Sequence, residues 1–200
     1  YLYAALAWHR LPQFKHMHAP APGHWPRVSL IITACNEADT IAAALRTLQA
    51  QQYPQLDILV VNDRSSDNTG EIVTQLSVLD ARIKLINIES LPADWLGKVH
   101  ALHSATQHAT GEWLLFADAD IHFHNEVIKQ AIAWAEAEQL DHLALIPHTR
   151  TGKRLLKATM NAFGLLFLVS MRAHSVANPR SSAAVGVGAF NLVRRSAFDR

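Results

Sequence analysis

Two hydrophobic patterns alternate along this chain. Short, mostly apolar runs cover 28–32, 56–61, 83–88, 113–117 and 142–147, and such runs are typical of strands buried in a parallel sheet. Between them, apolar residues recur every three or four positions, which predicts amphipathic helices. The alternation of strands and helices predicts an α/β fold with a doubly wound, mostly parallel sheet flanked by helices.

The most informative run extends from Trp113 to Ala117 and ends in Asp118 and Asp120. Parallel sheets bind ligands at the carboxyl ends of their strands. If the backbone stays extended through Ala119, both carboxylates point to the same side. Such oxygen donors suit Mg²⁺ or Mn²⁺ and, through the metal, a diphosphate. Taken alone, the motif is equally consistent with two solvated acids on a loop.

Two more charged residues stand at predicted ligand positions. Asp63 follows the second strand, where a carboxylate can accept hydrogen bonds from a base or a ribose. The alternative is that Asp63 only forms hydrogen bonds within its loop or caps the next helix. For Asp67 we favour this local role. Lys98 begins a helix after Gly97. The helix dipole disfavours a cation there, whereas a bound phosphate would favour one; simple surface solvation is the alternative.

The loop after the first strand, Thr33–Glu37, contains no glycine-rich phosphate motif. The dinucleotide fingerprint and the P-loop are therefore absent, and Asn36 is predicted to cap the next helix. His122 and His124 could contact a metal, but solvated histidines are the favoured interpretation.

Composition narrows the function further. A formal net charge of +1 with 50% hydrophobic residues argues against a disordered chain and against nucleic acid as the partner. A single cysteine, Cys35, rules out an internal disulfide and fits a reducing compartment.

The ends of the sequence suggest a segment of a longer, membrane-proximal protein. The chain begins at Tyr1 rather than at methionine, and residues 1–8 are apolar and aromatic, similar to the last turns of a membrane helix. We expect residues 1–26 to be a membrane-proximal segment with a linker, and 27–200 to be the catalytic domain, truncated at its C-terminal end. The pattern over 155–171 predicts a helix that lies in a membrane interface or packs over the acceptor side, with a buried core helix as the alternative. Residues 183–195 are predicted to form a glycine-interrupted strand.

Four segments together carry a family resemblance. They are Thr33–Glu37, Val61–Asp67, Gly97–Lys98 with Ala101 and Leu102, and Asp118–Asp120. In this order they resemble the motifs of family 2 glycosyltransferases with the GT-A fold, over about Arg27 to Arg200. More narrowly, Leu91–Lys98 and Gly186–Arg195 look like the members that glycosylate membrane lipids, such as the ceramide, carotenoid and hopanoid-associated transferases.

The resemblance implies an inverting transfer of a sugar from a UDP-sugar to a lipid or saccharide hydroxyl. It implies that Asp120 and Asp118 hold Mn²⁺ or Mg²⁺ and that Lys98 assists the leaving group. The donor contacts that it implies are Thr33, Ala34, Asn36, Glu37, Asp63, Lys98 and Asp118.

The family's carboxylate general base is expected beyond Arg200, so the segment alone is expected to be inactive. The protein is expected at a membrane surface, with its site on the cytoplasmic side. The alternative is a glycosyltransferase-like module that binds a sugar nucleotide without catalysis. A sugar nucleotidyltransferase is disfavoured because the first loop lacks glycines.

Overall fold

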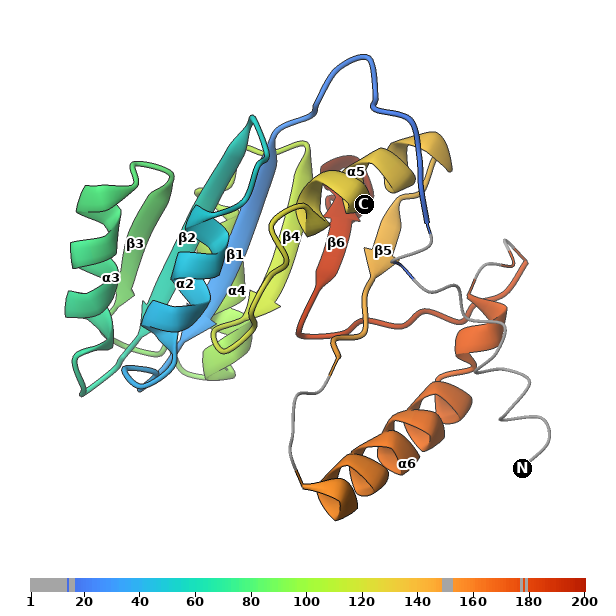
Figure 1. Cartoon of the computed structure of the whole chain (residues 1–200). Helices are drawn as coiled ribbons and strands as arrows, with labels where there is room; N and C mark the ends of the chain where they lie inside the picture. The colour runs from blue at the N-terminus through green and yellow to red at the C-terminus, as the bar shows by residue number, and fades with distance from the viewer. Residues whose placement is uncertain (1–13, 15–16, 149–152, 177, 179) are drawn as a thin grey trace. The chain divides into compact units, whose positions relative to one another are not determined.

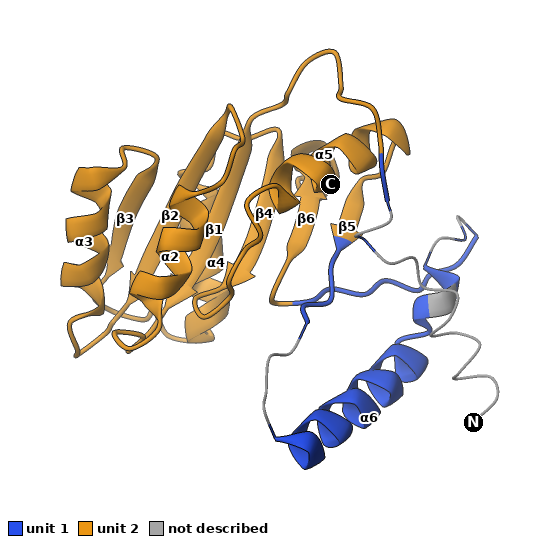
Figure 2. Ribbon diagram, viewed as in Figure 1, with its two compact units in different colours: residues 1–18, 144–187 blue, residues 19–143, 188–200 orange. Residues whose placement is uncertain are grey.

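The computed structural model describes residues 14, 17–148, 153–176, 178 and 180–200 (Figure 1). The chain divides into two compact units (Figure 2): residues 1–18 and 144–187 form unit 1, and residues 19–143 and 188–200 form unit 2. The membrane-helix resemblance at residues 1–8 lies outside the described residues.

A six-stranded sheet, most of it in unit 2, has the strand order β3-β2-β1-β4-β6-β5. The strands β1 to β4 run parallel, and β6 runs antiparallel to β4, so the predicted mostly parallel α/β fold is confirmed. The strand bounds are β1 Val28–Ala34, β2 Leu56–Asp63, β3 Ile83–Ile88, β4 Trp113–Asp118, β5 His142–Ala144 and β6 Asn191–Arg194.

Helices cover both faces of this sheet, with α2 and α3 on one face and α4 on the other (Figure 1). The helical period predicts the buried side of α2, since Ile41, Leu45 and Leu48 are all fully buried. On the opposite face, Ile31 belongs to the same buried cluster as Ala101 of α4. The helix bounds are α2 Ile41–Gln49, α3 Thr69–Leu79, α4 Gly97–Thr106, α5 Val127–Ala137 and α7 Arg195–Phe198.

The order of the strands creates a switch point between β1 and β4. The chain runs outward from β1 through β2 to β3, and α4 then returns it to β4 on the other side of β1. In such sheets, ligands bind beyond the carboxyl ends of the strands at this point. The register places Thr33 of β1 beside Asp118 of β4, so the predicted acidic motif lies at the switch point.

Four local expectations differ from the structure. The strand expected at 142–147 ends at Ala144. The backbone turns at Ala119–Asp120 directly after β4, instead of staying extended. Asn36 does not cap α2, which begins after Thr40. The glycine-interrupted strand shortens to β6, because β4 pairs with Asn191–Arg194 only and Gly186 and Gly188 lie before that pairing.

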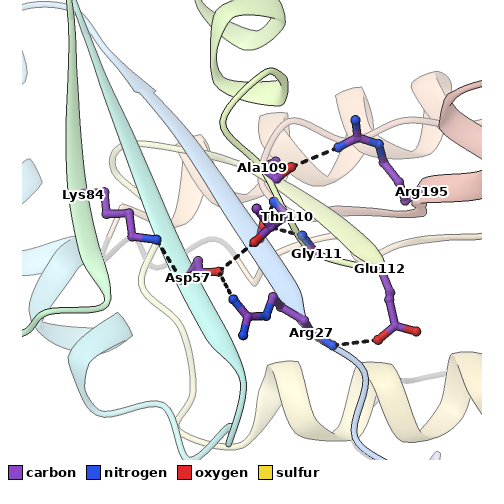
Figure 3. A network of polar contacts seen from close by, with 9 residues as sticks. Arg27, Asp57, Lys84, Ala109, Thr110, Gly111, Glu112 and Arg195 are labelled. Carbon is purple, nitrogen blue, oxygen red and sulfur yellow. Dashed lines mark hydrogen bonds and ion pairs between the residues drawn. The ribbon is translucent and has the colours of Figure 1, made fainter.

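A polar network joins the strands at their amino ends, at the opposite end of the strands from the acidic motif (Figure 3). The hydroxyl of Ser29, fully buried in β1, accepts hydrogen bonds from the backbone N–H of Thr110 at 3.2 Å and of Gly111 at 2.9 Å. The Asp57 carboxylate forms ion pairs with Arg27 at 3.4 Å and Lys84 at 3.1 Å. These bonds join β1, β2, β3 and the loop before β4.

Unit 1 contains the helix α6, Arg154–Ser170, and a short 3-10 turn, Ala173–Ser175. Within the described ranges, no helix has both the length and the apolar character needed to cross a membrane. Leu168 is the one residue of α6 that is buried, so α6 is not buried as a core helix would be.

Candidate functional site

Asn36 joins the loops that follow β1 and β2. Its backbone adopts a left-handed conformation with φ of 57°. Its backbone N–H donates to Ser65 Oγ at 3.0 Å, and its side-chain oxygen accepts from the backbone N–H of Ser66 at 2.8 Å. The amide side chain is therefore used between the loops, which is why it is not available to cap α2.

Asp67 makes a second connection between the same loops. Its carboxylate accepts from the hydroxyl of Thr69 at 2.5 Å and from the backbone N–H of Ala38 at 3.1 Å. The hydrogen bond from Thr69 is the main reason that the pKa of Asp67 lies below its usual value. Glu37 donates its backbone N–H to the same Thr69 hydroxyl at 2.8 Å. Asp67 thus has the local role that the sequence favours, and the two loops form one fixed rim.

Asp63, at the end of β2, is only 5% exposed and is paired with the next residue. Arg64 donates from Nε to Oδ1 at 2.7 Å and from Nη2 to Oδ2 at 3.1 Å. This side-chain hydrogen bonding raises the pKa of Arg64. Arg64 engages both carboxylate oxygens of Asp63. A base or ribose can therefore bond to Asp63 only if the guanidinium moves away or if one oxygen accepts from both groups.

The start of α4 packs directly on this pair. A Cβ atom at Gly97 would lie 2.6 Å from Arg64 Nη2 and 3.0 Å from Asp63 Oδ2, so a side chain here would displace the Arg64 guanidinium. The next residue, Lys98, donates from Nζ to Asp118 Oδ1 at 2.5 Å. The structure therefore brings together Asp63, Lys98 and Asp118, three predicted site residues from three different elements.

Gly188 lies against the other oxygen of Asp118. A Cβ atom there would be 2.6 Å from Oδ2 and 3.1 Å from Oδ1. The side chain of Asp118 is 37% exposed, and Asp120 is exposed on the following turn. Carboxylates are the ligands that hard divalent cations prefer, so Asp118 and Asp120 suit such a cation. Gly188 adds no side-chain atoms beside Asp118.

The protein's own ligands would form only part of such a cation's coordination shell. Across the residues that the structure describes, no group of three or more His, Cys, Asp and Glu side chains is arranged to hold a metal ion. The remaining ligands would therefore come from water or a bound molecule, as is usual for Mg²⁺ with phosphates. His122 and His124 are both exposed and belong to no such group.

The remaining predicted residues lie along the same edge of the sheet. Thr33 is half-buried in register with Asp118, while Ala34 is 1% exposed. Burial of the Ala34 methyl group means that its backbone is the part that can face a ligand.

Sequence reasoning missed the partnership of Arg64 with Asp63. Neighbouring side chains in a strand point to opposite faces, but the left-handed φ of 54° at Arg64 turns the chain there. No residue type in this loop signals that conformation, since Arg64 is not a glycine. The close approaches at Gly97 and Gly188 have one signal in the sequence, the glycines themselves.

Comparison with known proteins gives a family and a fold. Residues 29–200 match the model of glycosyl transferase family 2. The 4,4'-diaponeurosporenoate glycosyltransferase of Staphylococcus haemolyticus is 30% identical over 112 residues, which are 56% of this chain and 29% of that protein. The probable glycosyltransferase YdaM of Bacillus subtilis is 39% identical over 97 residues, 48% of this chain and 23% of that protein. The chain thus covers less than a third of each relative.

Solved structures show the same architecture. One match is the mannosyltransferase PcManGT from Pyrobaculum calidifontis in complex with GDP-Man and Mn²⁺, with a TM-score of 0.69 and 24% identity. The match covers all of this chain and 53% of the mannosyltransferase chain. Staphylococcus aureus TarS 1-349, in complex with UDP-GlcNAc, matches 64% of this chain and 36% of its own, with a TM-score of 0.55 and 26% identity. The sheet and its helices therefore have the GT-A fold that the resemblance predicts.

Proposed function

Because the chain belongs to glycosyl transferase family 2, we propose that it is the donor-binding part of an inverting, metal-assisted glycosyltransferase. The observation that carries this proposal is the contact of Lys98 with Asp118 at the switch point of the sheet. A lysine that meets a diphosphate and carboxylates that hold a metal are expected side by side, so this contact supports the proposal.

The proposed donor is a nucleoside diphosphate sugar, and a UDP-sugar is our specific proposal. Asp63 would accept hydrogen bonds from the nucleoside, exchanging part of its pairing with Arg64. The rim that holds Asn36 and Glu37, with Thr33 and Ala34 at the end of β1, would form the wall of the nucleoside site. The two structural neighbours support this donor class, since their complexes contain GDP-Man and UDP-GlcNAc.

Asp118 and Asp120 would hold Mn²⁺ or Mg²⁺ together with the diphosphate. The bound cation would supply Lewis-acid stabilisation of the negative charge on the leaving group. Lys98 would transfer its hydrogen bond from Asp118 to the diphosphate, and its charge would favour departure of the nucleoside diphosphate. The sugar would thus be activated at its anomeric carbon while the chain holds the leaving group in place.

The proposed acceptor is a hydroxyl of a lipid or a saccharide. Its oxygen would attack the anomeric carbon from the face opposite the leaving group, which inverts the configuration. A carboxylate base, proposed to lie outside residues 1–200, would take the hydroxyl proton. The carotenoid-type name of one relative supports a lipid acceptor. For this reason we propose membrane association, with residues 1–26 as a membrane-proximal segment and residues 27–200 on the cytoplasmic side.

The single cysteine allows a direct test of the donor site. Cys35 is exposed on the loop after β1, so a nucleotide bound against that loop should shield its thiol. We expect UDP with Mn²⁺ to slow alkylation of Cys35 by about tenfold. The variant Asp63→Ala should need about tenfold more UDP for the same protection, because a hydrogen bond to a charged group is lost.

The control is a cysteine far from the site. In a Cys35→Ser background, Val78→Cys places a thiol at a position on α3 that is 83% exposed. Its alkylation should not respond to UDP. Unchanged alkylation of Cys35 with millimolar UDP and Mn²⁺ would contradict the proposed donor site.

A further inference from the structure

The charges of this chain are divided between its two units. Unit 1 carries eight of the 18 lysine and arginine residues and none of the 17 aspartate and glutamate residues. Unit 2 therefore contains all 17 acidic residues with the other ten basic ones. A nearly neutral chain thus consists of a strongly cationic unit and an anionic unit.

The helix of the cationic unit also presents an apolar face. Leu155, Phe163 and Leu166 are 82%, 65% and 69% exposed. Their spacing of eight and three residues places them on one side of a helix, whereas Lys157 and Asn161 fall on another side. Large apolar side chains gathered in this way mark an interaction surface rather than ordinary solvent exposure.

Basic residues flank this face at both ends of the helix. Arg154 and Lys157 are exposed in its first turn, and Arg172 is exposed directly after its end. Long basic side chains near the ends of an interfacial helix reach the headgroups while the apolar face enters the acyl boundary. At 17 residues, α6 is also shorter than the roughly 20 residues of a spanning helix, which suits a position along the surface.

We propose that α6 docks unit 1 on a bilayer that contains anionic lipids, with Leu155, Phe163 and Leu166 inserted and the basic residues on the headgroups. The proposal rests on the membrane association proposed above and names the lipid class and the residues. A symmetric contact between the α6 helices of two copies is disfavoured, because it would bring two strongly cationic units together. An uncharged bilayer is also disfavoured, because its affinity for unit 1 would gain nothing from the absence of acidic residues there.

Vesicle binding of the whole chain tests this inference. Sedimentation with phosphatidylcholine vesicles would be compared with sedimentation with vesicles that also contain phosphatidylglycerol, at low and high salt. We expect binding to the anionic vesicles only, weakened by salt. The variant Phe163→Ser with Leu166→Ser should abolish it. Arg154→Gln with Lys157→Gln should reduce it about fivefold for each charge removed.

Matched control variants come from unit 2. Leu79→Ser changes an apolar side chain that is 77% exposed, and Arg46→Gln removes an exposed positive charge from α2; neither should affect vesicle binding. Equal binding to both kinds of vesicle, or full binding by the α6 variants, would overturn the proposal. So would an α6-dependent dimer that binds no vesicle. The shielding of Cys35 by UDP is measured without vesicles, so a failed donor site would be recognised separately.

Discussion

At the scale of single residues, Asp118 is contacted in two different ways. Lys98 binds one of its oxygens, and Gly188 leaves the space beside the other without side-chain atoms. In the proposed metal site, the first contact would compete with the cation for the carboxylate, whereas the second would keep side-chain atoms away from the other oxygen. Both contacts have consequences that can be measured.

Removing the lysine should change two affinities in opposite directions. In Lys98→Ala, Mn²⁺ alone should bind slightly more tightly, by about two- to fivefold, because an exposed ion pair is weak. UDP with Mn²⁺ should bind about tenfold more weakly, because the cation for the diphosphate is lost. Titration calorimetry measures both, and Lys84→Ala, which removes an ion pair at the opposite edge of the sheet, is the control. A loss of both affinities would mean that Lys98 does not compete with the metal.

Gly188 gives a second test of the space beside Asp118. In Gly188→Ala, the new methyl group would push on the carboxylate, and we expect UDP with Mn²⁺ to bind about tenfold more weakly. Gly23→Ala is the matched control, since a Cβ at Gly23 would meet nothing within 4 Å. Wild-type affinity in the Gly188 variant would show that the carboxylate need not keep this position.

The sequence alone selects Asp63, Lys98 and Asp118 as candidate site residues, because strand ends and helix starts follow from hydrophobic patterning. It does not predict which of them meet. Arg64 pairs with Asp63 through a left-handed backbone, and the turn at Ala119 depends on where β4 ends. These features arise from the packing of loops, which has no period along the chain.

At the scale of elements, the two ends of the sheet have different tasks. The carboxyl ends carry the candidate site, while the amino ends hold the Ser29 and Asp57 network (Figure 3). Strands with unbroken apolar runs could be predicted well. The strand at 183–195 was predicted too long, because its length is set by its partner β4 rather than by its own residues.

The network at the amino ends should contribute stability without affecting the site. In Ser29→Ala, the buried backbone N–H of Gly111 and the part-buried N–H of Thr110 lose their acceptor, which should lower the free energy of unfolding by about 1–3 kcal/mol. Urea unfolding measures this change. Ser77→Ala, which removes a hydroxyl bonded only within α3, should change stability little. A large loss of UDP affinity in a folded Ser29→Ala variant would contradict the claim that the network at the amino ends does not affect the candidate site.

Acid should weaken the connection between α2 and β3. Arg82 pairs with Asp80 at 2.7 Å and donates to the backbone oxygen of Gln49 at 2.7 Å. The hydrogen bond from Arg82 lowers the pKa of Asp80. The unfolded chain therefore binds this proton more readily, so the stability that Asp80 contributes is present above about pH 5 and is lost as the pH falls through about 4 and below.

The corresponding test is urea unfolding between pH 7 and pH 3. Stability of Asp80→Asn should fall less over this range than that of the parent, because the variant has no proton to gain at that site. Asp39→Asn changes an exposed carboxylate and serves as the control. Parallel pH profiles for the parent and Asp80→Asn would contradict the assignment.

At the scale of the whole molecule, the candidate donor site and the proposed membrane surface lie in different units. All acidic residues belong to the unit with the site, and the other unit is purely basic in its charged residues. The sequence contains this asymmetry, but the division into units is needed to see it. Membership of glycosyl transferase family 2 agrees with the fold of the unit that holds the candidate site.

The central claim is that Asp118 and Asp120 bind a nucleoside diphosphate through a divalent cation. Titration calorimetry of UDP into the folded chain, with and without Mn²⁺, measures this directly for the parent and for Asp120→Ala. We expect the parent to bind UDP only in the presence of Mn²⁺. In Asp120→Ala this binding should weaken by at least about tenfold, since a metal ligand is removed. Binding that needs neither the metal nor Asp120, or no binding at all by the folded parent, would contradict it.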